Sequence, residues 1–332
     1  MNRQVVLAAS PSGIPQARHF QIVERPVPDL APEQILVENH FLSVEPAMRG
    51  WLSDKGNYSS PIRIGDVMRA IAAGRVAAST CEQYPVGTLV TGWFGWQELA
   101  VARPQDVIRV VKEADLPLSL SLGVLGLNGM AAYLGLTLAG APVGGDTVVV
   151  STAAGAVGSI VGQVARLLGC RTVGITGSQA KVRACLDVYG YDAAADYSGR
   201  DLAPWLAEAC PQGINVYFDN TAGAISDAVR ARLSVGARIV VCGTASVSSW
   251  DPPPTGPRVE RDLLTKRARM QGFLAFDHRD RYESTVQALA AWVREGKLAW
   301  REDVLTGIEA CPDSIAGLYR GENMGKRVIR LR

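Results

Sequence analysis

The feature that most constrains this 332-residue chain is an apolar run that leads directly into a glycine-rich turn and then a helical pattern. The run Asp146–Ser151 is rich in β-branched residues, and the turn reads Ala153-x-Gly155-x-x-Gly158. Apolar residues then recur at helical spacing from Ile160 to Leu168. This order of strand, turn and helix predicts a site for a dinucleotide pyrophosphate, because the free N–H groups of the first helical turn face the anionic oxygens.

The end of the next expected strand, Arg171–Thr176, indicates which dinucleotide is bound. A site for NAD usually places Asp or Glu about 20 residues beyond the glycines, where the carboxylate accepts hydrogen bonds from the adenosine ribose. This chain has Gly177, Ser178 and, slightly later, Lys181 in that region. A hydroxyl and an ammonium group in place of a carboxylate favour NADPH over NADH. By spacing alone, Lys181 could equally be a solvated lysine in the first turn of the next helix.

Composition narrows the class of protein. With 48% hydrophobic residues the chain is long enough to form two cores, so we expect two domains. A formal net charge of +2 without a basic block gives no indication of nucleic acid or membrane-surface binding. The six cysteines form no C-x-x-C pair, and no apolar run is long enough to span a membrane. We expect a cytoplasmic enzyme without disulfides.

Two kinds of pattern divide the chain. Up to about residue 100 it has short β-type runs broken by Pro and Gly, at 34–39, 67–73, 88–92 and 97–101. From Gly123 onward, helical patterns at 122–138, 160–168, 180–189, 226–233, 263–269 and 282–296 alternate with strand patterns at 171–176, 216–219, 237–242 and 270–276. This alternation predicts a doubly wound parallel sheet. A last strand, 326–331, is expected to return to the first domain.

Several motifs in this order resemble the zinc-independent branch of the medium-chain dehydrogenase/reductase superfamily, close to the leukotriene and prostaglandin reductases, the alkenal double-bond reductases and the bacterial curcumin reductases. The resemblance covers essentially the whole chain. It is carried by the segments 41–49, 65–68, 126–133, 153–158, 217–220, 270–273 and 322–326. It implies an α/β protein with a GroES-like, partly open β-barrel domain (1–124 and 301–332) and a Rossmann NADPH-binding domain (125–300).

The resemblance also implies which residues bind NADPH. Gly155, Ala156, Val157 and Gly158 would hold the pyrophosphate, and Gly177, Ser178, Lys181 and Tyr197 would surround the 2′-phosphate. The rest of the cofactor would be lined by Asn220, Cys242, Gly243, Phe273, Leu274 and Asn323. Five of these residues have an ordinary structural explanation as well. Cys242 and Phe273 could be core residues, Tyr197 a strand-end aromatic, and Asn220 and Asn323 turn residues.

Zinc-dependent relatives need a cysteine and a Gly-His-Glu motif in the first domain. This chain has Gly65-Asp66-Val67 there and no cysteine before residue 81. We therefore expect no metal site and expect NADPH to deliver hydride to a polarised carbon–carbon double bond, as in an α,β-unsaturated ketone or aldehyde. The alternatives are an NADPH-dependent quinone or carbonyl reductase and a sensor that binds NADPH without turnover.

The proton donor is less clear from the sequence. Two tyrosines expected in some relatives are replaced by Ala47 and Thr265. Tyr58, in a Gly/Ser/Asn-flanked loop, is the candidate replacement, with a surface tyrosine that only shapes the pocket as the alternative. His278 lies in a charged loop and is given no role. The resemblance further suggests a homodimer formed through the edge strands of the Rossmann sheets.

Overall fold

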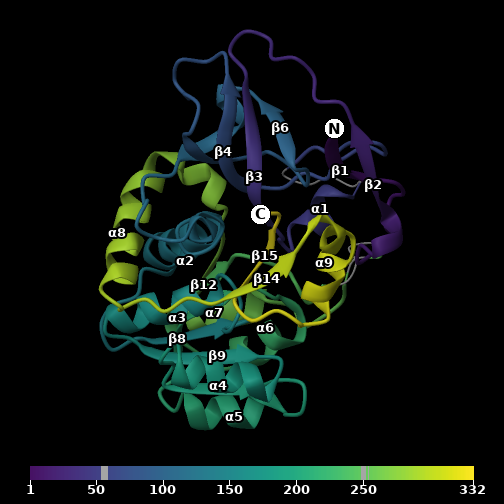
Figure 1. The fold of residues 1–332 in the computed structure, drawn as a ribbon. Helices are drawn as coiled ribbons and strands as arrows, with labels where there is room; N and C mark the ends of the chain where they lie inside the picture. The colour runs from purple at the N-terminus through teal and green to yellow at the C-terminus, as the bar shows by residue number, and fades with distance from the viewer. Residues whose placement is uncertain (54–58, 248–251, 253) are drawn as a thin grey trace. The chain divides into compact units, whose positions relative to one another are not determined.

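The computed structural model describes residues 1–53, 59–247, 252 and 254–332. Contacts between Cα atoms divide the chain into two compact units, Met1–Gly123 with Glu302–Arg332 and Val124–Arg301. The elements of both can be followed in Figure 1. None of the helices among the described residues is long and apolar enough to cross a membrane.

The first unit is built on a seven-stranded mixed sheet with the order β14-β15-β3-β4-β5-β7, in which β6 also pairs with β3. Its strands are β3 (Ile35–Ser43), β4 (Ala72–Ser79), β5 (Leu89–Gly92), β6 (Leu99–Ala102), β7 (Val107–Val110), β14 (Glu302–Thr306) and β15 (Lys326–Arg330). A separate hairpin pairs β1 (Asn2–Leu7) with β2 (Phe20–Arg25). The chain also forms α1 (Met48–Trp51) and α9 (Cys311–Tyr319) in this unit. The expected return of the last strand is confirmed, because β15 pairs antiparallel with β3.

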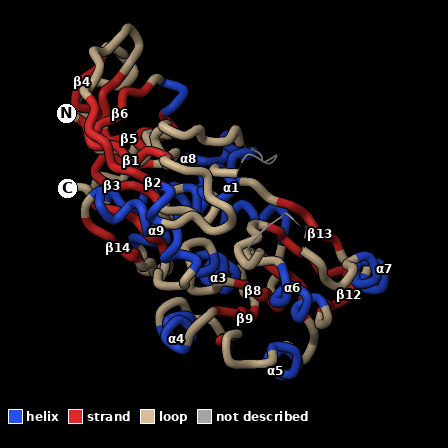
Figure 2. Tube along the Cα trace, turned by 90° about the vertical axis from the view of Figure 1, so that its right-hand side faces the viewer, coloured by secondary structure: helices blue, strands red, loops and turns tan. Residues whose placement is uncertain are grey.

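The second unit is a six-stranded sheet in which every neighbouring pair is parallel, with the order β10-β9-β8-β11-β12-β13. The strands are β8 (Thr147–Ser151), β9 (Arg171–Thr176), β10 (Ala193–Asp196), β11 (Ile214–Asp219), β12 (Leu233–Val241) and β13 (Arg269–Gly272). The helices are α2 (Leu127–Leu134), α3 (Gly158–Leu167), α4 (Gln179–Asp187), α5 (Leu202–Ala209), α6 (Gly223–Arg230), α7 (Glu260–Lys266) and α8 (Tyr282–Arg294). The predicted fold class, with a doubly wound parallel sheet, is confirmed (Figure 2).

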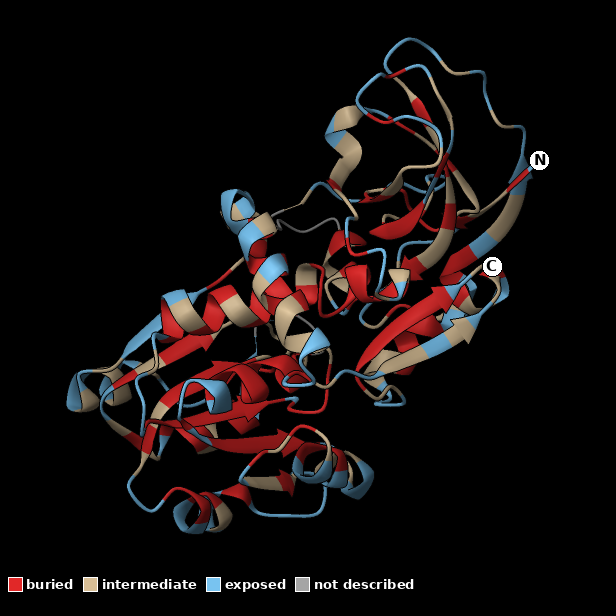
Figure 3. Ribbon diagram, turned by 60° about the vertical axis from the view of Figure 1, so that its left-hand side comes forward, coloured by how far each residue is buried: buried red, intermediate tan, exposed pale blue. Residues whose placement is uncertain are grey.

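Alternation along the strands explains how helices cover both faces of this sheet. Alternate residues such as Val149, Val173 and Tyr217 pack with α5 and α6 in one buried cluster. Gly174, between Val173 and Ile175, points to the opposite face, where α3 lies against β8 and β9. Strand β8 is buried over its whole length, and Figure 3 colours the chain by how far each residue is buried. A strand buried on both faces reads as an unbroken apolar run, as in the sequence.

Some predicted elements were wrong in their bounds. The strand expected at 67–73 is β4, eight residues from Ala72 to Ser79. The helix expected at 122–138 is α2, preceded by a 3-10 helix at Leu118–Leu122 and followed by a π-helix at Gly135–Gly140. The strand expected at 270–276 ends at Gly272, and a 3-10 helix begins at Ala275. Glycines at 123, 126 and 135 break the longer helical pattern into turns of different pitch.

Candidate functional site

The turn after β8 has little room for side chains. A Cβ atom on Gly158 would lie 2.3 Å from the backbone oxygen of Thr152, and one on Gly155 would lie 2.8 Å from the Thr152 Cγ2. Thr152 itself has a φ of 54°, in the left-handed region. The chain then enters α3 at Gly158, so this turn lies at the carboxyl end of β8, where the N-terminus of α3 favours an anion.

A tyrosine that the sequence did not single out holds this helix against the sheet. The hydroxyl of Tyr191 donates to the backbone oxygen of Gly158 at 2.7 Å. Its ring fills the space left by Gly162 of α3, where a Cβ atom would lie 2.1 Å from the ring, and also contacts Gly174 of β9. Burial raises the pKa of the Tyr191 phenol well above its usual value, so the hydroxyl remains a donor.

The end of β9 brings together the residues expected at the 2′-phosphate. Ser178 caps α4, and its hydroxyl accepts from the backbone N–H of Lys181 at 3.3 Å. A Cβ atom on Gly177 would lie 3.2 Å from the hydroxyl of Tyr197, so the half-exposed Tyr197 ring lies against this turn. Gly177, Ser178 and Tyr197 therefore lie together at the N-terminus of α4, whose third residue is Lys181, and a helix N-terminus favours an anion.

A carboxylate lies next to these residues and was not predicted. Asp196 pairs with Thr176 at the end of β10, directly before Tyr197. Its carboxylate accepts from the hydroxyl and the backbone N–H of Ser198 at 2.6 and 2.9 Å. These hydrogen bonds, with a smaller contribution from Gln179, lower the pKa of Asp196. The hydrogen bonds from Ser198 therefore stabilise the negative charge of the Asp196 carboxylate.

Asn220 is fixed by the neighbouring strand. Its backbone N–H donates to the Ser151 hydroxyl and its side-chain amide donates to the Ser151 carbonyl, each at 2.8 Å. Ser151 ends β8 and Asn220 follows β11, so these bonds connect adjacent strand ends. Gly243 lies directly against this turn, where a Cβ atom would be 2.9 Å from the Asn220 oxygen. Desolvation, with a smaller contribution from Asp219, raises the pKa of the Cys242 thiol to about 12.

Phe273 follows β13 and is buried. Its backbone N–H donates to the Val241 oxygen at 3.0 Å, and its ring stacks on His278 with centroids 5.0 Å apart. Leu274 comes next, directly before the 3-10 helix that contains His278. His278 is therefore a packing partner of a candidate site residue, which its charged sequence neighbours did not indicate.

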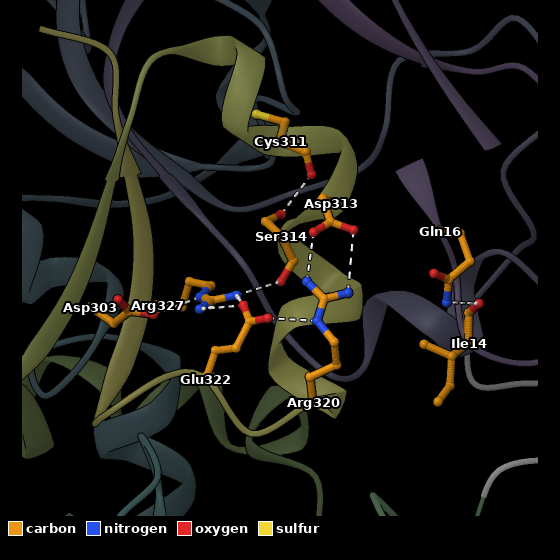
Figure 4. A network of polar contacts seen from close by, with 9 residues as sticks. All are labelled: Ile14, Gln16, Asp303, Cys311, Asp313, Ser314, Arg320, Glu322 and Arg327. Atoms are coloured by element: carbon orange, nitrogen blue, oxygen red, sulfur yellow. Dashed lines mark hydrogen bonds and ion pairs between the residues drawn. The ribbon is translucent and has the colours of Figure 1, made fainter. Parts of the chain in front are cut away.

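Asn323 belongs to the other unit, in the loop between α9 and β15. Its side-chain amide donates to the Gly325 oxygen at 2.9 Å. The preceding Glu322 accepts from Arg320 and from the buried Arg327, and Figure 4 shows this network. Arg327 also donates to Asp303 at 2.6 Å and to the Ser314 oxygen at 3.1 Å. The loop that carries Asn323 is therefore held by ion pairs from Arg320 to Asp313 of α9 and from Glu322 to Arg327 of β15.

Lys326, the first residue of β15, is buried directly after this loop. Its Nζ atom donates to the Ser43 hydroxyl at 2.7 Å, the Val44 oxygen at 2.8 Å and the Glu45 carboxylate at 2.7 Å. The Glu302 carboxylate accepts from the Ser119 hydroxyl at 2.8 Å. Burial is the main cause of a lowered pKa for Lys326 and a raised pKa for Glu302.

Tyr58, the candidate proton donor, lies outside the described residues. Thr265 lies on α7, where its hydroxyl donates to the Arg261 oxygen at 2.8 Å. In the described part of the chain, no three His, Cys, Asp or Glu side chains are grouped as a metal ion would require.

Comparison with known proteins decides the family. Residues 3–110 match the family described as the N-terminal domain of oxidoreductase, and residues 156–291 match the family described as zinc-binding dehydrogenase. The chain is 39% identical over 335 residues to NADPH-dependent curcumin reductase of Escherichia coli, covering 99% of this chain and 97% of that protein. The chain belongs to the zinc-independent branch of the medium-chain dehydrogenase/reductase superfamily.

Two further relatives agree with this membership. A 2-alkenal reductase (NADP(+)-dependent) of Nicotiana tabacum is 35% identical over 333 residues, covering 99% of this chain and 97% of that protein. The crystal structure of CurA in complex with NADPH from Vibrio vulnificus superimposes with a TM-score of 0.93 at 38% identity, covering 99% of both chains. The resemblance to this family stated from the sequence is therefore confirmed, and the chain is a member of an oxidoreductase family.

Proposed function

We propose that this protein uses NADPH to reduce the carbon–carbon double bond of α,β-unsaturated ketones and aldehydes. Two relatives are named for their substrates, a curcumin reductase and a 2-alkenal reductase, and both kinds of substrate contain such a bond next to a carbonyl. The observation that carries the cofactor assignment is the position of Ser178, Lys181 and Tyr197 at the end of β9 and the N-terminus of α4, which suits an added phosphate.

In this proposal, three groups of residues bind the cofactor. The turn Gly155–Gly158 binds the pyrophosphate, and Gly177, Ser178, Lys181 and Tyr197 bind the 2′-phosphate. We assign Asn220, Cys242, Gly243, Phe273 and Leu274 to the nicotinamide half, and Asn323 to the cofactor as well, as the resemblance implies. The close approach at Gly155 and Gly158, where a side chain has no room, supports the first assignment. When bound by these residues, NADPH would supply the hydride that is added to the β-carbon of the substrate.

The protein's own contribution is to bind, orient and protonate. Negative charge collects on the carbonyl oxygen as the hydride arrives, so a hydrogen-bond donor aimed at that oxygen accelerates the reaction. We assign a proton donor role to Tyr58, a phenol that can donate a hydrogen bond and then a proton. The proton ends on the α-carbon, which completes addition of two hydrogens across the double bond.

The proposal is tested by NADPH oxidation with a short 2-alkenal, an aryl enone, a quinone and a saturated aldehyde, each repeated with NADH. We expect turnover with the alkenal and the enone and a preference for NADPH. Turnover restricted to the quinone or to the saturated aldehyde would indicate a quinone or carbonyl reductase instead. Tight NADPH binding without turnover of any of the four would indicate a sensor.

We also propose that the protein acts as a cytoplasmic homodimer. Strand β13 is the edge of the parallel sheet, and all four of its residues are exposed. An exposed strand edge is a ready template for pairing with a second copy. Sedimentation equilibrium that gives the mass of one chain, 35.4 kDa, at micromolar concentration would contradict the dimer.

A further inference from the structure

Asp219 carries a buried carboxylate at the end of β11. The residue is 2% exposed. Its Oδ1 atom accepts from the Tyr217 hydroxyl at 3.0 Å and from the backbone N–H groups of Thr221 and Ala222 at 2.9 and 2.8 Å. The Ser226 hydroxyl donates to Oδ2. Both oxygens of the carboxylate therefore accept hydrogen bonds.

No cation balances this charge in the part of the chain that the structure describes. Every group within hydrogen-bond distance of the Asp219 side chain is a neutral hydroxyl or a backbone N–H. The N-terminus of α6 adds only a partial positive charge. The neighbouring groups respond to the charge: it contributes, after desolvation, to the raised pKa of both Tyr217 and Cys242. Asp219 is therefore a site of uncompensated negative charge in a medium of low dielectric constant.

The strand order places this charge under one half of a bound dinucleotide. From β8 the strands are added first on one side (β9, β10) and then on the other (β11, β12, β13), and ligands bind at the carboxyl ends of parallel strands at such a switch point. The phosphate-binding turn follows β8 and the residues assigned to the 2′-phosphate follow β9, so the adenosine half lies on the β9 side. The nicotinamide half must then lie over the ends of β11 and β12, beside Asn220. Asp219 directly precedes Asn220.

We propose that the buried Asp219 carboxylate stabilises the oxidised, cationic cofactor relative to the reduced one, and so makes bound NADPH a stronger hydride donor. This inference rests on the proposed function. The electron balance is that of the proposed reaction: two electrons and a proton leave the cofactor as hydride, and the ring gains one positive charge. A buried anion stabilises that gain, while it leaves the neutral ring of the reduced form almost unaffected.

The test compares dissociation constants for NADP⁺ and NADPH in the wild type and in Asp219→Asn. The variant keeps the shape of the side chain, and the Ser226 hydroxyl can turn to accept from the new amide. We expect binding of NADP⁺ to weaken about threefold to tenfold relative to NADPH. A tenfold change in this ratio raises the two-electron potential of the bound couple by about 30 mV. A ratio that stays within about 1.5-fold of the wild type would overturn the proposal.

Tyr217→Phe is the matched control, because it removes one donor to Asp219 and retains the charge. We expect it to weaken both forms of the cofactor equally, as a structural effect would. If Tyr217→Phe changed the ratio of the two dissociation constants as much as Asp219→Asn does, the change would come from altered geometry and not from loss of the charge, and the proposal would fail. Asp219→Ser, which also removes the charge, replaces Asp219→Asn if that variant does not fold.

The wild type alone provides a second measurement. We expect it to bind NADP⁺ at least as tightly as NADPH. A wild-type protein that binds NADPH more than about tenfold tighter than NADP⁺ would contradict the proposal without any variant. A wild type that binds neither form would instead contradict the proposed function, so the two failures can be told apart.

Discussion

Asn220 is bound twice by Ser151: its backbone N–H donates to the serine hydroxyl and its side-chain amide donates to the serine carbonyl, both at 2.8 Å. Ser151 is fully buried at the end of β8. One residue of the first strand therefore sets both the backbone and the side chain of a residue on the neighbouring strand. The two hydrogen bonds to Ser151 therefore fix the orientation of Asn220 relative to the sheet.

Ser151→Ala tests this relationship. The substitution leaves the Asn220 N–H without its acceptor, which costs about 1–3 kcal/mol when the group is buried. We expect a lower free energy of unfolding and a dissociation constant for NADPH that rises about threefold to tenfold, measured by fluorescence titration. Ser314→Ala is the control: that buried hydroxyl donates within α9, at 2.7 Å to the Cys311 oxygen. An equal loss of NADPH affinity in both variants would show that Ser151 has no specific role.

Lys181→Ala tests the choice of cofactor. Loss of an ammonium group beside the 2′-phosphate is expected to raise the dissociation constant of NADPH about tenfold and to leave that of NADH unchanged. Arg183→Ala, an exposed cation on the same helix, is the control and should change neither. If Lys181→Ala behaved like the control, Lys181 would be a solvated helix residue after all.

Glu302→Gln gives a pH-dependent prediction. Burial raises the pKa of Glu302 in the folded protein above its usual value of 4.5. The folded state then holds the proton more tightly than the unfolded state, so wild-type stability is lost as the pH rises through the folded-state pKa. The glutamine variant mimics the protonated form, so we expect it to be more stable than the wild type at about pH 8 and equal to it at about pH 4.

The measurement is urea unfolding at both pH values. Glu309→Gln is the control of opposite sign, because a hydrogen bond from Arg3 lowers the pKa of the Glu309 carboxylate. That variant should be no more stable than the wild type at the higher pH. A stabilisation by Glu302→Gln that did not depend on pH would refute the explanation by ionisation.

Tyr58→Phe tests the proton donor. We expect turnover with an enone to fall while the dissociation constant of NADPH stays the same, because in the proposal the phenol acts on the substrate and not on the cofactor. Stopped-flow and fluorescence titration give the two quantities separately. Unchanged turnover would remove Tyr58 from the mechanism.

Local patterns predicted the central elements of the parallel sheet well. The bounds of β9, Arg171–Thr176, are those expected, since a β-branched run between a glycine and a Gly-Ser turn has no competing interpretation. The glycine turn was also predicted correctly from the sequence, because the backbone passes so close to Thr152 that Gly155 and Gly158 have no room for a side chain. By contrast, β10 and α5 were missed: Ala193–Asp196 is short and contains three alanines, a residue type that is depleted in strands.

The parts of the site that sequence could not predict depend on contacts between distant segments. Tyr191 acts on α3 through spaces left by Gly162 and Gly174, and neither glycine is near it in sequence. The acceptors that Ser151 provides for Asn220 depend on β8 and β11 being neighbours, which only the strand order establishes. The network of Arg320, Glu322 and Arg327 likewise looks in the sequence like scattered surface charge.

The most direct test of the central claim follows the hydride itself. The protein is incubated with an aryl enone and NADPH deuterated at nicotinamide carbon 4 on the transferred face, with both labelled faces tried in turn. The proposed function predicts a saturated ketone that carries one deuterium on the β-carbon with one of the two labels. An alcohol labelled at the carbonyl carbon, or no transfer of deuterium from either face, would contradict it.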